Sequence, residues 1–320
     1  MAVYVNTNYS ALQGQRYLGN VQNSLTTTYQ RLSSGMRINS AKDDAAGLQI
    51  ADRLTSQING LNQGNRNASD GIALAQTAEA GMDEISGMLQ KIRTLAVQAN
   101  NGTNTAEDKK ALSKEATALA TEVNRIAMQT TFAGKTILNG KQANSIDPVA
   151  GGAGPGAGAA GVAQSITLQV GSNKGDTISF ALQNLQFSKI ADGGNVGGQA
   201  NFGADAAAGK AFIAIKDGVT VVQFSAAGAP ETVIEVMDKM LGYVDGQRAD
   251  LGAIQNRLES SIRNQSNVAA NEADARSRIR DADFAEESAN LSQQSIIQQA
   301  AASMLMQANT RPQLGLSLLG

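Results

Sequence analysis

Residues 75–99 read AQTAEAGMDEISGMLQKIRTLAVQA, and apolar or small side chains recur there at alternating steps of three and four residues. Side chains at this spacing share one face of an α-helix, so the pattern predicts a heptad seam. The seam consists of Ala75, Ala78, Met82, Ile85, Leu89, Ile92 and Ala96. Because alanine fills much of it, the seam buries little area, and the helix needs a neighbouring helix to be stable.

The chain on both sides of this stretch continues the helical pattern. Residues 100–104 read NNGTN, a strong turn signal, and Thr105 is followed three residues later by Asp108 in the spacing of a capping box. We therefore expect a helical hairpin of residues 75–99 and 106–129. Its second seam is predicted at Leu112, Ala116, Leu119, Val123 and Ile126.

Long helices are also predicted near both ends of the chain. No proline lies before Pro148 or between Pro230 and Pro312, so these tracts are free of the main helix breaker. A last helix is expected from beyond Asp281 to a stop at Arg311–Pro312. The remaining seams comprise Leu18, Val21, Leu25, Thr28 and Leu32 near the N-terminus, then Val233, Met237, Met240, Val244, Leu251, Ile254 and Leu258, and finally Leu291, Ile297, Met304 and Leu305.

The middle of the chain differs in kind. Residues 150–161 read AGGAGPGAGAAG, which is typical of a flexible linker. Period-two alternation predicts one β-hairpin from residues 165–170 and 177–182, and a second from 212–215 and 219–224. Residues 191–209 are rich in Gly and Ala and are expected to form a loop. The predicted fold is mainly α: a long coiled-coil-like helical bundle from N- and C-terminal arms, with a small β-rich central insertion.

Composition excludes several classes of function. The chain has no Cys, no His and no Trp, so disulfides, zinc fingers and Ser-His-Asp or Cys-His nucleophile systems are ruled out. An enzyme built from it would rely on carboxylate, Lys or Tyr chemistry. A formal net charge of -2 argues against nucleic-acid binding. The sequence contains no run of 18 apolar residues, so it does not predict a membrane-spanning segment. The N-terminal residues lack the pattern of a secretory signal.

Two glycine motifs resemble nucleotide-binding loops but lack their context. Residues 156–161 satisfy GxGxxG, yet a Gly/Ala linker precedes them and a strand follows. Residues 134–136 mimic the end of a P-loop, but its opening glycine would fall at Gln129. We therefore expect no cofactor.

Charged clusters are expected to cap helices or lie at the surface. The paired carboxylates occur at residues 43–44, 281/283 and 286–287, and no EF-hand spacing accompanies them. Arg276, Arg278 and Arg280 are bracketed by acidic residues, which favours a solvated or salt-bridged helix surface. No catalytic or metal-binding residue is predicted.

Several long strings, in order along the chain, resemble the signatures of bacterial flagellin. The N-terminal strings lie at 31–48 (RLSSGMRINSAKDDAAGL), 67–72, 89–98 and 132–140, and the C-terminal strings lie at 250–258, 275–284 and 307–319. The likeness covers about residues 1–140 and 230–320.

This resemblance implies a structural subunit of the flagellar filament that serves swimming motility. Such a subunit is exported unfolded through the flagellum's own channel and is located outside the cell. By the same resemblance, residues 1–44 and 276–320 form an inner tube and are disordered in the monomer. Residues 45–140 and 231–275 form the outer tube, and 141–230 form the central surface segment. The terminal residues are polar and poor in large apolar groups, which suits segments that order on assembly.

The resemblance also implies partners and site residues. The partners are further copies of the chain, the export chaperone, the filament cap, hook-associated proteins and the flagellin-sensing Toll-like receptor. Receptor-facing or subunit-interface candidates are Gln90, Lys91, Arg93, Leu95 and Glu115, and Thr94 stands where many family members have Glu. Polymerisation candidates are Leu18, Val21, Leu25, Leu291, Ile297, Met304 and Leu305.

Two alternatives stay open on the sequence alone. A hook–filament junction protein shares the terminal architecture but would show a more divergent core. A helical enzyme that uses carboxylates would be a stable monomer with a preformed pocket, which the sparse chain ends disfavour.

Overall fold

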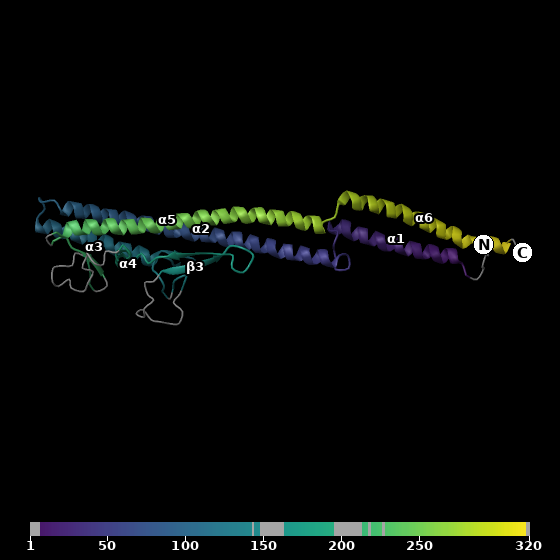
Figure 1. The fold of residues 1–320 in the computed structure, drawn as a ribbon, viewed down its shortest axis with the longest axis horizontal. Coiled ribbons are helices and arrows are strands. Elements are labelled where there is room, and N and C mark those ends of the chain that lie inside the picture. Colours follow the sequence, from purple (N-terminus) through teal and green to yellow (C-terminus); the bar gives the residue numbers. More distant parts are fainter. Residues whose placement is uncertain are drawn as a thin grey trace. The chain divides into compact units, whose positions relative to one another are not determined.

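The computed structural model describes residues 7–142, 144–147, 163–194, 213–216, 219–225 and 228–317, and the expected linker at 150–161 lies outside them. The chain divides into two compact units, Met1–Asn59 with Asn267–Gly320 (unit 1) and Gly60–Ser266 (unit 2). The described helices are α1 (Tyr9–Ser34), α2 (Ala45–Ala99), α3 (Ala106–Gln129), α4 (Phe187–Gly193), α5 (Ala229–Arg280) and α6 (Phe284–Ser317) (Figure 1). The predicted fold class is confirmed: helices dominate, and the strands among the described residues are short and lie in the central part of the chain.

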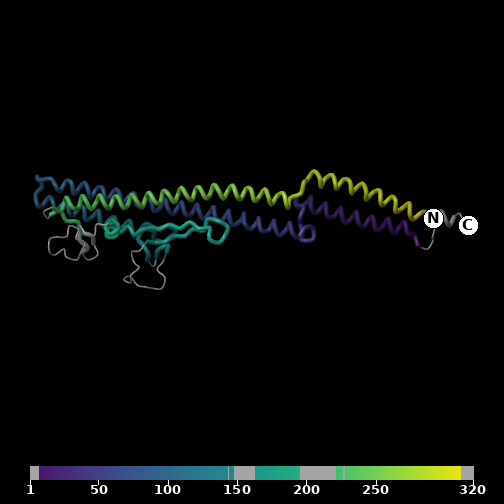
Figure 2. The backbone as a smooth tube through the Cα atoms, viewed as in Figure 1, coloured from purple at the N-terminus to yellow at the C-terminus, as the bar shows by residue number. Residues whose placement is uncertain are grey.

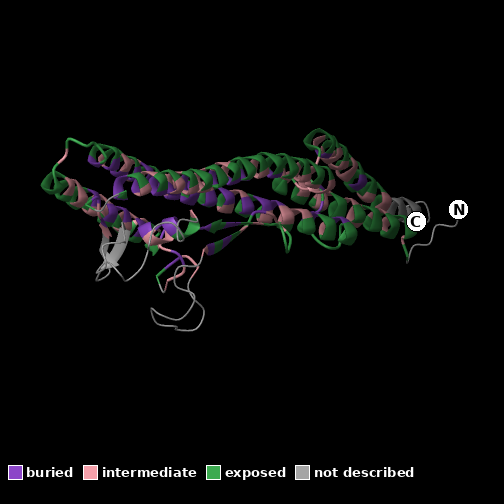
Figure 3. Ribbon diagram, turned by 60° about the vertical axis from the view of Figure 1, so that its left-hand side comes forward, coloured by how far each residue is buried: buried purple, intermediate pink, exposed green. Residues whose placement is uncertain are grey.

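The core of unit 2 is built from the predicted seams of α2 and α5. Every α2 seam residue from Ala75 to Ala96 is at most 1% exposed, and the α5 seam residues between Val233 and Leu258 are also buried. Figure 3 shows these buried positions as a stripe along the helices. Periodic apolar residues thus give the two helices matching faces, and each face covers the other.

The seam of α3 is rotated from its predicted position. Its buried residues are Ala116, Ala120, Val123 and Ala127, whereas Leu112, Leu119 and Ile126 are only partly buried against the same core. Small alanines allow the closest approach of two helices, so they occupy the contact line and the larger side chains flank it. The predicted start is confirmed, because Thr105 and Asp108 form a reciprocal capping box.

The described strands form three separate antiparallel pairs. Their bounds are β1 (Thr131–Phe132), β2 (Lys135–Thr136), β3 (Gln164–Gln169), β4 (Thr177–Leu182), β5 (Ile213–Lys216) and β6 (Val219–Val222). The pairs are β1–β2, β3–β4 and β5–β6. Both predicted hairpins are confirmed to within about two residues in the described part, and Phe212 lies outside it.

Helix α4 replaces the beginning of the loop expected at 191–209. Residues 191–193 belong to this helix, and 195–209 lie outside the described residues. Phe187 and Ile190 of α4 are fully buried in the core of unit 2. Burial of these apolar side chains explains a short helix that the Gly/Ala-rich sequence does not indicate.

The β3–β4 hairpin packs on glycines of α2. A Cβ atom at Gly64 would overlap the carbonyl oxygen of Val170, and one at Gly60 would come within 2.7 Å of Ser172 Cβ. Between these glycines and Gly71, Asn67 Nδ2 donates to Gln169 O over 2.8 Å. We call Gly60, Gly64 and Gly71 the glycine track. The track lets the backbone of the hairpin lie directly against the helix (Figure 2).

Strand β6 is held on α3 by hydroxyl groups. Thr117 Oγ1 accepts the amide of Val222 at 3.1 Å, and Ser113 Oγ accepts the amide of Phe224 at 2.9 Å. Phe224 itself is fully buried. Side-chain hydroxyls therefore satisfy backbone groups of the segment that would lack partners in a two-stranded pair.

In unit 1, α1 and α6 lie side by side and antiparallel (Figure 2). Polar contacts join the two helices at both ends of the pair. Arg31 forms an ion pair with Glu287 at one end, and Asn8 donates a hydrogen bond to the Ala308 carbonyl at the other. The prediction that the last helix stops at Arg311–Pro312 is wrong, because α6 continues to Ser317. Pro312 lacks an amide hydrogen for the carbonyl of Ala308, and Asn8 Nδ2 donates to that carbonyl at 2.7 Å instead.

Candidate assembly surface

The seam residues predicted for polymerisation lie on α1 and α6. Six of them are half-buried between or beside the two helices, and these are Leu18, Val21, Leu25, Leu291, Ile297 and Leu305. Met304 differs, because it is 72% exposed. Most of the predicted set is therefore partly shielded from solvent within this chain, whereas Met304 is exposed.

Large apolar side chains cover the outside of the same two helices. Twelve such side chains are exposed among the described residues, and eight of the twelve belong to α1 or α6. These eight, which we call the outer apolar set, are Tyr9, Leu12, Tyr17, Tyr29, Phe284, Ile296, Met304 and Met306. Such a concentration of exposed apolar side chains on two helices is typical of an interaction surface.

Only Met304 of the outer apolar set lies at a predicted seam position. The other seven members lie off the predicted seams. A signal was present: a helix with apolar residues on more than one face indicates contacts with more than one neighbour.

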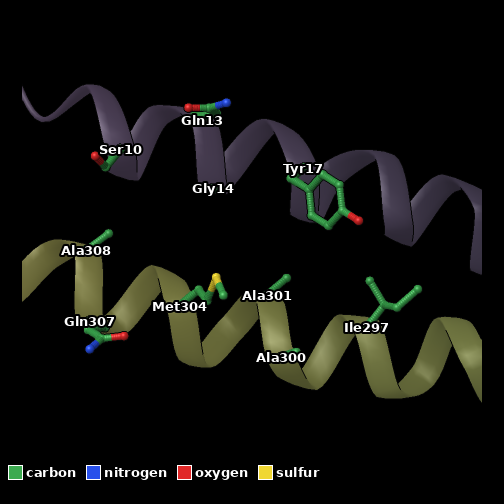
Figure 4. Close-up of a pocket in the computed structure, with 10 residues that line it drawn as sticks. All are labelled: Ser10, Gln13, Gly14, Tyr17, Ile297, Ala300, Ala301, Met304, Gln307 and Ala308. Atoms are coloured by element: carbon green, nitrogen blue, oxygen red, sulfur yellow. The ribbon is translucent and has the colours of Figure 1, made fainter.

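A groove of about 770 Å³ runs between α1 and α6 (Figure 4). Its wall is formed by Ser10, Gln13, Gly14 and Tyr17 of α1 and by Ile297, Ala300, Ala301, Met304, Gln307 and Ala308 of α6. A Cβ at Gly14 would lie 3.2 Å from Leu305 Cδ1, so the helices approach closely there. Small and apolar side chains form much of this lining, and they fit the groove to an apolar side chain.

The receptor-facing candidates fall on α2 and α3 of unit 2. Gln90, Lys91 and Glu115 are exposed, and Leu95 is partly buried against the core. Arg93 Nε contacts Asp238 Oδ1 of α5 at 2.5 Å, and the hydrogen bond and charge of Asp238 raise the pKa of Arg93 above its ordinary value. Four candidates thus lie within two turns of α2, and Glu115 lies on the next helix.

The carboxylate pairs act as caps and ion-pair partners. The Ser40 and Asn39 amides hydrogen-bond Asp43 and lower its pKa, while Asp44 Oδ1 accepts the amide of Gly47 at 2.9 Å. Glu287 is 7% exposed and pairs with Arg31 at 3.1 Å. Among the described residues, no group of three or more acidic side chains gathers as a metal site.

Two arginines of the basic cluster near the end of α5 contact side chains of unit 1. Arg278 pairs with Asp274 at 3.0 Å, and Arg276 Nη1 lies 3.4 Å from Thr55 Oγ1. These contacts agree with a salt-bridged helix surface. No helix in the described part of the chain is long and apolar enough to cross a membrane.

Comparisons with known proteins agree with this arrangement. Residues 5–143 match the bacterial flagellin N-terminal helical region, and residues 234–319 match the bacterial flagellin C-terminal helical region. Flagellin A of Vibrio anguillarum is 36% identical over 378 aligned positions, and polar flagellin C of Vibrio parahaemolyticus serotype O3:K6 is 35% identical over 383. Both alignments cover 100% of this chain and of the relative.

A solved structure shares the fold. The putative flagellar hook-associated protein from Vibrio parahaemolyticus aligns with a TM-score of 0.55 at 15% identity, over 75% of this chain and 100% of that one. Identity at this level shows a common fold and does not favour the junction-protein alternative.

Paired terminal helices with an apolar outer face define a subunit of a helical assembly. The chain belongs to the bacterial flagellin family. Its function is that of a structural subunit of the flagellar filament, which lies outside the cell.

Proposed function

We propose that the outer apolar set of α1 and α6 forms the contacts between neighbouring subunits of the filament. The observation that carries this proposal is that, among the described residues, eight of the twelve exposed large apolar side chains lie on these two helices. Covering such side chains removes apolar area from water, which is the main driving force of protein association.

The geometry favours an open polymer over a closed dimer. The groove between α1 and α6 and the outer apolar set are different surfaces, apart from Tyr17 and Met304, which belong to both. An apolar side chain of one copy that enters the groove of the next forms a head-to-tail contact, and such contacts generate helical filaments when they do not close. In this arrangement residues 1–44 and 276–320 form the inner tube, 45–140 and 231–275 surround it, and 141–230 lie outside.

Further partners follow from the same surfaces. We infer that the export chaperone, the filament cap and hook-associated proteins engage the terminal helices, whose apolar residues need cover before and after assembly. The Toll-like receptor would contact Gln90, Lys91, Arg93, Leu95 and Glu115. Exposure of Gln90, Lys91 and Glu115 supports this contact, and the same residues also suit contacts between subunits.

The test is seeded filament growth of a variant with one charge in the outer apolar set. Met304→Glu should slow elongation at least about tenfold, because a buried carboxylate without a partner disrupts the contact. Gln299→Glu is the matched control, since it adds the same charge at an exposed polar position of α6 and should grow like the parent. Elongation from flagellar fragments is followed by electron microscopy, and circular dichroism verifies folding. Growth of Met304→Glu at the parental rate would contradict the proposal.

A further inference from the structure

We propose that two polar contacts at opposite ends of the α1–α6 pair fix the register of the two helices. One is the Arg31–Glu287 ion pair, and the other is the hydrogen bond from Asn8 to the Ala308 carbonyl. We call them the polar locks. Both lie within one chain, so the proposal does not depend on which residues contact neighbouring subunits.

Part of the seam between the locks repeats after one heptad, so those positions do not select one register. Leu18 and Leu25 are seven residues apart, and so are Ala301 and Ala308. A slip of one heptad, about 10.5 Å along the axis, moves Leu18 to the level that Leu25 occupies, so this part of the seam repeats, whereas Gln298 would replace Leu305 opposite Gly14. Seams of repeated aliphatic residues are known to need a polar residue to select their pairing.

The Arg31–Glu287 contact penalises a slip because the carboxylate is buried. Glu287 is 7% exposed, and its Oε1 accepts from Arg31 Nη1 at 3.1 Å. Moving Arg31 by a heptad would leave this carboxylate without its cation, which costs more than the pair contributes when it is formed. Thr28 adds a weaker contact one turn away, since its hydroxyl donates to Gln294 Oε1 at 3.4 Å.

The second lock depends on Pro312. Inside a helix each carbonyl normally accepts the amide four residues later, but Pro312 has no amide hydrogen to donate to Ala308. The Ala308 carbonyl is therefore a distinctive acceptor on α6, and Asn8 Nδ2 reaches it at 2.7 Å. The Oδ1 atom of the same side chain caps α1 by accepting the amide of Ala11 at 3.1 Å. Asn8 thus ties the first turn of α1 to one level of α6.

The test uses introduced cysteine pairs, which are unambiguous because the chain has no cysteine of its own. Gly14→Cys with Leu305→Cys reports the observed register, since a Cβ at Gly14 lies 3.2 Å from Leu305 Cδ1. Gly14→Cys with Gln298→Cys reports a slip of one heptad. Both pairs are oxidised in the full chain, in solution and in filaments. Mass spectrometry of linked peptides, with mixed single-cysteine chains as controls, separates links within a chain from links between chains.

In the parent chain the native link should exceed the slipped link by about tenfold or more. Arg31→Leu with Glu287→Leu should reduce this ratio to within about threefold while the thermal midpoint of the helices does not fall, because apolar replacement of a buried pair is commonly neutral or stabilising. Arg31→Glu with Glu287→Arg restores opposite charges and should keep the parental ratio. A leucine variant that keeps the parental ratio, or that no longer forms α1 and α6, would overturn the role of this pair.

The Pro312→Ala variant distinguishes an effect on the register of the two helices from an effect on the stability of α6. It restores an amide donor to Ala308 and favours the helix, yet it should lower the ratio of native to slipped links, as Asn8→Ala should. Unchanged ratios in both variants would overturn this lock. A parent that gives both links equally in every state would overturn the whole proposal. Failure of the parent to polymerise would instead count against the assembly surface, because the cross-links are read within one chain.

Discussion

Some residues of this chain matter because they lack a side chain. The glycine track on α2 is such a case, since Gly64 lies directly beneath the carbonyl oxygen of Val170. Glycine inside a helix costs about 1 kcal/mol relative to alanine, so from the sequence alone it is expected to destabilise the helix. Here that loss is offset by the close approach of the hairpin.

Gly64→Ala should lower the free energy of unfolding of the chain. The new methyl group would displace the hairpin or strain the helix, at about 1–3 kcal/mol, which exceeds the gain in helix propensity. Gly87→Ala is the matched control on the same helix, because nothing lies within 4 Å of a Cβ there. It should raise stability by about 0.5–1 kcal/mol. Urea unfolding followed by circular dichroism measures both, and equal effects of the two variants would refute the packing role.

At the residue scale, sequence alone predicts local contacts and misses distant ones. The capping box of Thr105 and Asp108 is predictable because both partners lie within one turn. The contact of Gly64 with Val170 spans more than a hundred positions, and no local pattern carries it. Asn8 is similar, because its acceptor lies near the other end of the chain.

The elements of unit 2 are stabilised by interlocking seams. Ile92 is fully buried in the α2 seam, whereas Val97 on the same helix is 51% exposed. Both are β-branched residues of one helix, so truncating each compares a position inside the seam with one outside it.

Ile92→Ala should lower the free energy of unfolding by about 2–5 kcal/mol, because it removes buried methyl groups and leaves a cavity. Val97→Ala should change it by no more than about 0.5 kcal/mol, as expected for an exposed position. Thermal and urea denaturation of the two variants provide the comparison. Similar losses at both positions would show that the seam is not the main source of stability.

Long periodic elements are the ones that the sequence predicts well. The α2 and α5 seams repeat over many turns, so their phase is fixed by many residues. The α3 seam is short and rich in alanine, and Ala120 and Ala127 replace the predicted Leu119 and Ile126 on the contact line. The β1–β2 pair and α4 are too short to show a period, and tertiary burial determines them.

Across the whole molecule, burial is distributed unevenly between the two units. The buried core cluster of unit 2 includes residues of α2, α3, α4 and α5, whereas α1 has one buried residue, Thr28. A two-helix pair covers only one side of each helix. This difference supports the prediction that the terminal helices become ordered upon assembly.

Hydrogen exchange should resolve the difference. In the soluble chain, amides of α1 and α6 should exchange faster than those of the α2 and α5 seams by on the order of a hundredfold or more, because little buried area opposes local opening. In filaments the same amides should become protected. Mass spectrometry of peptic fragments reads both states, and terminal helices that are equally protected before and after assembly would contradict the expectation.

The assembly surface could be predicted only in part from the sequence. The terminal helices and their seam were predictable from periodicity, and so was Met304. The other members of the outer apolar set depend on which helix faces stay uncovered, and this follows from the pairing of α1 with α6 rather than from either helix alone.

The glycine track also limits how this chain can change in length over evolution. Inserting a single residue between Gly60 and Gly71 would rotate all following positions by about 100° and turn bulky neighbours toward the hairpin. Such an insertion would cause steric overlap with the hairpin, even though the helical hydrogen bonds of α2 would remain intact. Tolerated insertions and deletions should therefore accumulate outside residues 60–71, in the stretch between the two family-matched regions, 5–143 and 234–319.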